Sequence, residues 1–316
     1  MRAVVVTDFL TEPGLADLPL PEPGPGEVLV RLAAAGVNPF DWKVIEGAMR
    51  DSVHHAFPLV LGSDGAGTVE SIGADVADFN PGDRVFGSFM DVKHGRGSYA
   101  EYAIAKAAKL AHLPSGIAFD LAAALPTASA AAYTFVEGTG VGPGQTLLVN
   151  GASGGVGQSA VQLAAAQGVH VIATSGPDSA DYLRELGASE TVDYTAVPTV
   201  EQVRSAHPDG IDAIVDLVSS SAQIESVAGL LKPNGSIVSS NGVIDAELLA
   251  TRGLRGANLY ANSAPATLAF LAASVESGQL RVRIDYQVPL EEAAEALARL
   301  RKGKARGKTV LSIDLA

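Results

Sequence analysis

The sequence predicts an α/β protein in which a nucleotide-binding domain is inserted between the two parts of a smaller, β-rich domain. In the first 120 residues, Gly, Pro and Asp interrupt the chain every few residues, which is typical of short strands joined by turns. After that point, apolar strand segments alternate with helical segments, and this alternation indicates a doubly wound parallel sheet. We therefore assign residues 1–120 and 262–316 to the β-rich domain and residues 121–261 to the inserted domain.

The β-rich domain is expected to begin with a strand at the N-terminus and to continue with a strand from Glu27 to Ala35. Two Gly-containing segments, residues 60–73 and 79–89, are interpreted as further short strands. The C-terminal part of the domain has periodicities that predict helix, strand, helix and strand in turn. These segments are residues 264–277, 282–287, 291–302 and 308–314.

The inserted domain is expected to start with an alanine-rich helix, residues 121–136, which leads to a strand and a glycine-rich turn. Six segments then alternate between strand and helix patterns, and a last strand at residues 254–260 completes the sheet. The six segments are HVIATS, SADYLREL, ASETVDY, GIDAIVDLV, SAQIESVAGLL and GSIVSSNG.

The most informative stretch runs from Thr146 to Gly168, where an apolar strand, a glycine cluster and a helix follow one another. Ala152, Gly154 and Gly157 fit the pattern G-x-G-x-x-G with Ala in the first place. Such glycines let the backbone approach a pyrophosphate, and the free N–H groups at the helix N-terminus bind its charge. The predicted cofactor-binding residues here are Ala152, Ser153, Gly154, Gly155, Val156 and Gly157.

The end of the second strand indicates which dinucleotide is bound. About twenty residues after the glycine loop, a carboxylate would hold the ribose 2′-hydroxyl of NAD. This chain has Thr174, Ser175 and Gly176 there instead. Because a carboxylate would repel a 2′-phosphate, Ser175 favours NADPH, with NADH as the alternative.

Composition excludes several classes of function. The formal net charge of -13 disfavours binding to nucleic acid or to an anionic membrane surface. The absence of cysteine rules out disulfides, thiolate catalysis and cysteine-based metal sites. No window approaches the roughly 20 apolar residues of a membrane span, and the N-terminus lacks the pattern of a signal peptide. We therefore expect a cytoplasmic protein without nucleic-acid or membrane partners.

The whole chain resembles the zinc-independent quinone oxidoreductase and enone reductase branch of the medium-chain dehydrogenase/reductase superfamily. The resemblance implies a GroES-like catalytic domain, a Rossmann domain, a cofactor in the cleft between them, and a homodimer joined through the edge of the Rossmann sheet. The segments that carry it are GEVLVRLAAAGVNPFDWKVIEG, LGSDGAGTVESIG, PGDRVFG, LPTASAAAYTFVE, NGASGGVGQSAVQLA, YLRELGASETVDY, LLKPNGSIVSSNG and GKARGKTVL.

The resemblance also bears on metal chemistry. Zinc-dependent members of the superfamily bind the metal through one cysteine and two histidines, and the matching positions here look to be Asn38, Lys43 and Ser63. An amide, an ammonium and a hydroxyl cannot make the tetrahedral nitrogen and sulfur site that zinc needs. We therefore expect no metal site.

The activity that the resemblance implies is hydride transfer from NADPH to a small hydrophobic quinone, or to the activated C=C bond of an α,β-unsaturated ketone. Asn38 and Lys43 are the candidates to meet the developing negative charge, and Asp41 is expected to pair with Lys43 and fix its position.

By the same resemblance, Tyr194 is expected beside the adenosine phosphate. Ser240, Asn241 and Gly242 are expected near the nicotinamide, because ligands lie at the carboxyl ends of strands in such sheets. Val218 is expected to contact the cofactor as well, and Lys308 is expected either to reach its phosphates or to lie in a solvated turn.

Two other functions stay open at this point. One is an enoyl-thioester reductase of lipid or polyketide assembly, which the acidic composition disfavours if the substrate is carried by an acidic protein. The other is a non-catalytic binding protein that senses NADPH.

Overall fold

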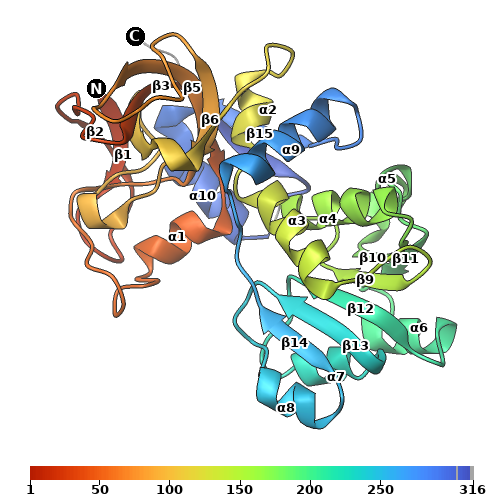
Figure 1. The fold of residues 1–316 in the computed structure, drawn as a ribbon. Helices are drawn as coiled ribbons and strands as arrows, with labels where there is room; N and C mark the ends of the chain where they lie inside the picture. Colours follow the sequence, from red (N-terminus) through yellow and green to blue (C-terminus); the bar gives the residue numbers. More distant parts are fainter. Residues whose placement is uncertain (304, 314–316) are drawn as a thin grey trace. The chain divides into compact units, whose positions relative to one another are not determined.

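The computed structural model describes residues 1–303 and 305–313 (Figure 1). Lys304 and Asp314, which fall in segments used for the sequence predictions, lie outside the described residues. The chain divides into two compact units. The first contains residues 1–130, 263–277 and 282–316, and the second contains residues 131–262 and 278–281. The α/β fold class expected from the sequence is confirmed.

The first unit is built on two sheets, one of seven strands and one of three. In the larger sheet the strand order is β15-β16-β3-β5-β6-β8, with β7 also paired to β3, and in the smaller one it is β2-β1-β4. The strands are β1 (Arg2–Val6), β2 (Gly14–Asp17), β3 (Glu27–Val37), β4 (Leu59–Val60), β5 (Asp64–Ile72), β6 (Arg84–Ser88), β7 (Tyr102–Lys106), β8 (Leu110–His112), β15 (Ile284–Pro289) and β16 (Lys308–Ser312).

Strand β3 is the centre of this unit because it pairs with β5, β7 and β16, all antiparallel. Its residues Val30 and Leu32 belong to one core with Val69, Val85 and Phe89. Among the described residues, four α-helices lie mainly in this unit, and α2 contacts both β3 and β5. They are α1 (Pro39–Ile45), α2 (Phe119–Ala123), α9 (Pro265–Glu276) and α10 (Ala293–Arg301).

The second unit contains a six-stranded parallel sheet in the order β11-β10-β9-β12-β13-β14. The chain begins at the centre with β9, moves outward through β10 and β11, and then returns to the other side of β9 with β12. This reversal is the topological switch point at which such sheets bind ligands. The strands are β9 (Thr146–Asn150), β10 (His170–Ser175), β11 (Glu190–Asp193), β12 (Ile211–Asp216), β13 (Leu231–Ser239) and β14 (Arg255–Asn258).

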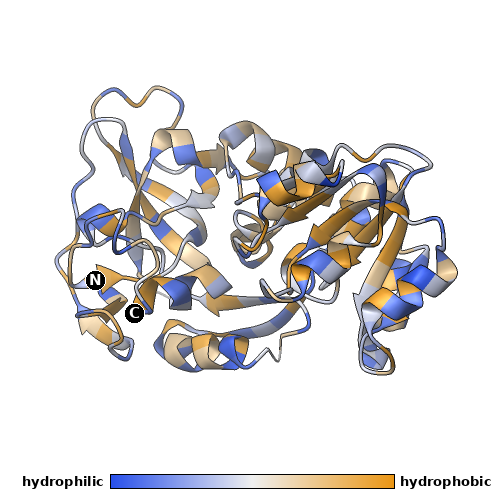
Figure 2. Ribbon diagram, turned by 90° about the horizontal axis from the view of Figure 1, so that it is seen from below, coloured by the Kyte–Doolittle hydropathy of each residue, from blue (hydrophilic) through white to orange (hydrophobic). Residues whose placement is uncertain are grey.

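Helices cover both faces of this sheet. On one face Leu147 packs with apolar residues of α3, α4 and α5, while on the other Leu148 packs with residues of α6, α7 and α8. A parallel sheet buried on both faces needs apolar runs in its strands, such as LLV in β9 and AIV in β12. Hydropathy colouring shows several strands that are largely orange, the hydrophobic end of the scale (Figure 2). The helices are α3 (Ala128–Thr139), α4 (Gly155–Ala166), α5 (Ala180–Glu185), α6 (Thr199–Ala206), α7 (Ile224–Ala228) and α8 (Ala246–Thr251).

The structure differs from the sequence prediction between residues 120 and 136. The single helix expected there is two helices, α2 and α3, with Pro126 between them. Proline has no N–H to donate and disfavours helical backbone at the residue before it. Because α2 packs on β3 and β5, residues 121–130 belong to the first unit, and the division falls at Ala130 rather than at residue 120.

No helix formed by residues 1–303 and 305–313 combines the length and the apolar character needed to cross a bilayer.

Candidate functional site

The glycine loop lies at the carboxyl end of β9, at the switch point of the sheet in the second unit. Gly151 has a φ of 99°, and a Cβ there would lie 2.8 Å from Val218 Cγ1. A Cβ on Gly157 would lie 2.3 Å from the carbonyl oxygen of Gly151 and 2.5 Å from the Cα of Ala152. The fold itself therefore requires glycine at both positions.

Gly154 differs from its neighbours because the fold leaves room beside it. A Cβ on Gly154 would meet only the carbonyl oxygen of Gly151, at 3.8 Å, and its φ of -79° suits any residue. Gly154 is the N-cap of α4, and within the described chain no side chain caps this helix. The space beside Gly154 and the free amides of the first turn form a cradle of the kind that binds a pyrophosphate.

A buried hydrogen-bond network holds the loop to three strand ends. Asp216, at the end of β12, accepts hydrogen bonds from Asn150 Nδ2 at 2.7 Å and from the Ser219 hydroxyl at 2.7 Å. Thr174, in β10, accepts a hydrogen bond from the amide of Gly151 at 2.8 Å and donates to Asn150 Oδ1 at 3.3 Å. The ends of β9, β10 and β12 are thereby fixed relative to the glycine loop.

Sequence reasoning did not select Asn150, Thr174 or Asp216. The available signal was that each is a polar residue at or next to the end of an apolar strand, in LLVN, IATS and IVD. Polar strand ends that converge at one sheet edge are typical of ligand sites in parallel sheets.

The other predicted cofactor residues of the second unit lie at the same sheet edge. Ser175 is the buried last residue of β10, and its carbonyl accepts a hydrogen bond from the amide of Tyr194, which follows β11 and is 52% exposed. Val218 follows β12 and is 60% exposed. Asn241 joins two loops, since its side chain donates to the Ser219 carbonyl. Ser240, Asn241 and Gly242 directly follow β13.

Lys308 is placed differently from the expectation that it reaches cofactor phosphates. The residue is 4% exposed inside the first unit. Its ammonium donates to the carbonyl of Val37 at 3.1 Å and to Asn38 Oδ1, and it lies 4.0 Å from Asp64 Oδ2. The Lys308 ammonium therefore binds groups inside the first unit. This placement corrects the expectation that Lys308 reaches the phosphates of the cofactor.

Asn38 and Asp41 owe their positions to the start of helix α1. Asn38 is the N-cap, Pro39 fills the first helical position, and Asp41 at the third position accepts the Asn38 amide proton at 2.8 Å. This contact belongs to a capping box, a common way to satisfy the amides at a helix start. The Asn38 side chain then donates to Asp64 Oδ2 at 2.9 Å.

The expected pair of Asp41 and Lys43 does not form among the described residues. Asp41 is fully buried and accepts hydrogen bonds from the Tyr99 hydroxyl at 2.7 Å and the Ser63 hydroxyl at 3.3 Å, besides the Asn38 amide. Lys43 is part-exposed two residues further along α1, with its ammonium 5.7 Å from the centre of the Trp42 ring. Asp41 and Lys43 are the third and fifth residues of α1, and residues two positions apart point to different sides of a helix. Their side chains therefore do not meet.

Asp64 completes a set of polar side chains that we call the buried cluster. It accepts hydrogen bonds from the Thr127 amide at 3.0 Å and the Thr127 hydroxyl at 2.6 Å, in addition to the one from Asn38. The buried cluster consists of Asn38, Asp41, Ser63, Asp64, Tyr99, Thr127 and Lys308. It therefore contains two carboxyl groups and one ammonium.

Burial dominates the electrostatics of this cluster. It raises the pKa of Asp41 from 3.8 to about 7, against the hydrogen bonds from Tyr99 and Asn38. Burial also raises the pKa of Asp64 and lowers the pKa of Lys308, although these two opposite charges oppose each other's shifts. When Asp41 carries a proton, Asp64 and Lys308 remain as a balanced pair of charges. A proton on Asp41 thus lowers the cost of burying the cluster.

This arrangement predicts a pH dependence of stability. Between pH of about 4 and about 7 the folded protein keeps a proton on Asp41 that the unfolded chain releases. The free energy of unfolding should therefore decrease as pH rises through this range, by up to a few kcal/mol, since one pKa unit corresponds to ~1.4 kcal/mol. Urea denaturation at several pH values, with Asp41→Asn as the non-titrating control, measures it. A slope equal in the two proteins would show that Asp41 titrates normally.

The residues around Asn38 do not fit a catalytic zinc ion. The positions matched to zinc ligands carry the Asn38 amide, the Lys43 ammonium and the Ser63 hydroxyl, none of which is a thiolate or an imidazole. The carboxylate of Asp64 already has a cation, Lys308, 4.0 Å away. A divalent ion at this place would be repelled by that ammonium, so no step of the chemistry is assigned to zinc.

Comparison with known proteins agrees with the domain types expected from the sequence. Residues 24–115 match the family described as the alcohol dehydrogenase GroES-like domain, and residues 186–311 match the family described as zinc-binding dehydrogenase. The chain is 33% identical to a chloroplastic quinone oxidoreductase of Triphysaria versicolor, over 93% of this chain and 92% of that protein.

Two solved structures share this fold over nearly the whole length of the chain. The quinone oxidoreductase from Coxiella burnetii superimposes with a TM-score of 0.88 and 30% identity, over 99% of both chains. A mycobacterial protein solved in complex with NADPH superimposes with a TM-score of 0.86 and 27% identity, also over 99% of both chains. The GroES-like and Rossmann architecture is therefore confirmed, and the chain belongs to the quinone oxidoreductase branch of the medium-chain dehydrogenase/reductase superfamily.

Proposed function

We propose that this protein is an NADPH-dependent, zinc-independent oxidoreductase that reduces a quinone or the activated C=C bond of an α,β-unsaturated ketone. The observation that carries the proposal is the cradle beside Gly154, where the fold leaves space next to the uncapped first turn of α4. The relative solved with NADPH and the relatives named quinone oxidoreductases support the cofactor and the reaction class.

The residues of the second unit would hold the cofactor. The amides of the first turn of α4 would bind the pyrophosphate, and the network centred on Asp216 keeps that loop in place. When bound, the nicotinamide supplies the hydride. Ser240, Asn241 and Gly242, at the carboxyl end of β13, are the residues we assign to the nicotinamide end, and Tyr194 is assigned to the adenosine end.

Preference for NADPH over NADH is proposed from Ser175. The end of β10 carries a hydroxyl where an NAD-binding chain would carry a carboxylate, so the repulsion that a carboxylate at position 175 would exert on a 2′-phosphate is removed. A comparison of kcat/KM for NADPH and NADH tests this preference. A higher value for NADH would overturn it without affecting the assigned reaction.

Reduction of a quinone or an enone places negative charge on an oxygen, and a hydrogen-bond donor or a cation must stabilise it. Lys43 is suited to this task because it is part-exposed and, among the described residues, has no carboxylate partner. Asn38 is less free to move, since Asp64 and Lys308 hold both ends of its amide. We propose Lys43 as the group that stabilises the anion. Asn38 is proposed as a positioning residue at the start of α1, because its amide nitrogen already donates to Asp64 Oδ2 and to the Gly36 carbonyl.

Lys43→Ala should lower turnover by at least about tenfold while leaving the dissociation constant of NADPH within about twofold of wild type. The physical reason is that the ammonium acts on charge that develops only during the reaction. Stopped-flow single turnover and a separate NADPH titration measure the two quantities. Lys109→Ala, an exposed lysine of the same unit, is the control. Turnover unchanged in Lys43→Ala would remove Lys43 from the mechanism.

Oxidation of NADPH across a panel of quinones, enones and enoyl thioesters tests the substrate class. Turnover with quinones or enones, and little with thioesters, is the expected result. The opposite preference would assign the enoyl-thioester reductase function. Tight NADPH binding with no turnover on any member of the panel would leave a cofactor-sensing protein.

We also propose a homodimer that forms through β14, the edge strand of the six-stranded sheet. An exposed strand edge offers unpaired backbone groups that a second copy can satisfy. Sedimentation equilibrium distinguishes this dimer from a monomer.

A further inference from the structure

A second group of polar residues lies on the second unit, away from the glycine loop. His170 is the first residue of β10, Glu190 is the first residue of β11, and His207 follows the last residue of α6. The glycine loop follows the carboxyl end of the central strand, whereas these residues are at strand starts. The length of β10, about 3.3 Å per residue, therefore separates the two edges of the sheet.

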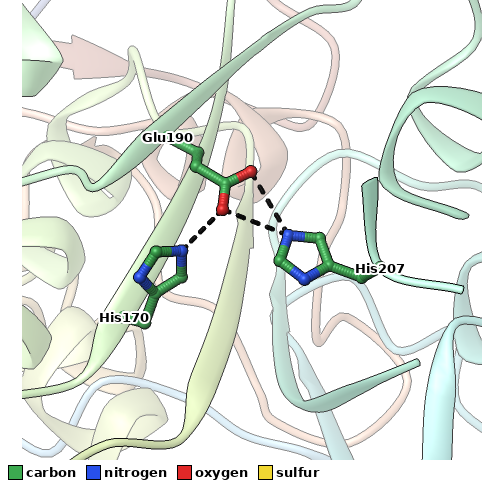
Figure 3. Close-up of side chains that lie close together, drawn as sticks. All are labelled: His170, Glu190 and His207. Atoms are coloured by element: carbon green, nitrogen blue, oxygen red, sulfur yellow. Dashed lines mark hydrogen bonds and ion pairs between the residues drawn. The ribbon is translucent and has the colours of Figure 1, made fainter. Parts of the chain in front are cut away.

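The three side chains converge on one point (Figure 3). His170 Nε2 lies 2.6 Å from Glu190 Oε1, and His207 Nε2 lies 3.2 Å from both carboxylate oxygens of Glu190. One ligand atom from each residue lies within 4.8 Å of the other two. Within residues 1–303 and 305–313, this is the one place where three potential metal ligands of these types meet.

These distances suit a small metal ion after only a slight movement. Zinc binds histidine nitrogen and carboxylate oxygen at about 2.0–2.2 Å, so two ligand atoms on a tetrahedral ion are roughly 3.4 Å apart. The contacts between the histidines and Glu190 are already 2.6 and 3.2 Å. Opening these contacts by less than about 1 Å would give the spacing of zinc ligands, and the ligand atoms of the two histidines lie within 4.8 Å of each other.

The donor set also selects the kind of ion. Two imidazoles and one carboxylate suit borderline transition metals such as Zn²⁺, Co²⁺ and Ni²⁺, whereas Mg²⁺ and Ca²⁺ prefer oxygen ligands. The side chains of His170, Glu190 and His207 are 40%, 35% and 21% exposed, so solvent ions can reach them. Burial would raise the pKa of Glu190, but its hydrogen bonds to the two histidines lower it, so the group is an anion at neutral pH.

We propose that His170, Glu190 and His207 bind one divalent transition-metal ion at the amino edge of the six-stranded sheet. The ion would tie β10 to β11 and to the end of α6, all within the second unit, and its role would be structural. This inference is independent of the proposed reaction, since none of the three residues belongs to the glycine loop or to the buried cluster.

Proton balance follows from the hydrogen bonds now present. Each imidazole that donates Nε2–H to Glu190 must carry its proton on Nδ1 before Nε2 can bind a metal. For neutral imidazoles this change of tautomer releases no proton. A protonated imidazole would release one proton when it binds the metal.

The test uses the untagged chain of 316 residues after treatment with a chelator. Titration with Zn²⁺, followed by calorimetry, should show one saturable site per chain, and thermal unfolding should shift to higher temperature at saturation. Co²⁺ should give the visible absorption of a bound, non-octahedral ion. Mg²⁺ at the same concentrations should produce neither effect.

Three variants make the result specific. Glu190→Gln and His207→Asn should each weaken Zn²⁺ binding by at least about tenfold and abolish the thermal shift, because each removes one of three ligands. The matched control is His94→Asn, since among the described residues His94 pairs with Asp91 and belongs to no group of three potential ligands. Circular dichroism checks that each variant is folded. Absence of a saturable site in wild type, or equal affinity in the Glu190 and His207 variants, would overturn the proposal.

Discussion

Lys308→Met is expected to lower the free energy of unfolding by about 3–5 kcal/mol, the usual effect of leaving a buried charge without its partner. Lys308 is 4% exposed and is the cation that faces Asp64 and Asn38 in the buried cluster. Without its ammonium, Asp64 must either remain charged without a counterion or take up a proton. Urea denaturation at neutral pH measures the loss.

Two further measurements separate charge from packing in this variant. The loss should shrink below pH of about 4, where the carboxyl groups of the buried cluster are protonated in both states. The double variant Lys308→Met with Asp64→Asn should be more stable than the sum of the two single effects predicts. Lys109→Met, at an exposed position, should change stability by less than about 0.5 kcal/mol. A loss independent of pH and additive with Asp64→Asn would show that Lys308 contributes packing only.

Two alanine substitutions in the glycine loop should change different properties: Gly157→Ala should lower stability, and Gly154→Ala should weaken NADPH binding. Gly157→Ala places a Cβ 2.3 Å from the Gly151 carbonyl oxygen, so it should cost at least about 1–3 kcal/mol of stability. Gly154→Ala meets nothing closer than 3.8 Å and should change stability by less than about 1 kcal/mol. It should nevertheless weaken NADPH binding by at least about tenfold, because its methyl group fills the cradle.

Thermal unfolding and NADPH titration of both variants test these two expectations. If the Gly154→Ala variant binds NADPH as tightly as wild type, the phosphates do not lie beside Gly154. Gly157→Ala with wild-type stability would show that α4 does not pack as closely on the loop as described.

Local patterns predicted most of the fold. The helix at residues 264–277 is α9, Pro265–Glu276, and the strand at residues 254–260 is β14, Arg255–Asn258. Such segments are predictable because their periodicity and flanking turn residues act over short distances. The break at Pro126 between α2 and α3 was also a local signal, which the alanine-rich composition obscured.

The buried cluster could be predicted only in part. Asn38 and Asp41 are separated by the three-residue spacing of a capping box, so their contact was available from sequence. Lys308 is 270 residues from Asn38 and reaches it because β16 pairs with β3. Nothing in the sequence around Lys308 distinguishes this buried lysine from a solvated one. Its role depends on strand pairing between distant segments.

The group of His170, Glu190 and His207 shows the same limit. The residues are separated by 20 and 17 positions and lie on two strands and the end of a helix, so they form no short metal-binding motif. The expectation of no metal site rested instead on Asn38, Lys43 and Ser63 at the positions of zinc ligands, and it did not consider the two histidines and the glutamate of this group. Only the parallel register of β10 and β11 brings His170 and Glu190 together.

The most direct test of the zinc-free reductase is single-turnover oxidation of NADPH by a quinone, before and after removal of metal ions with a chelator. We expect the same rate in both cases, because the residues around Asn38 offer no site for catalytic zinc. Metal removal should change only thermal stability, through the site at His170, Glu190 and His207. Loss of turnover on chelation, with recovery on addition of Zn²⁺, would contradict this expectation.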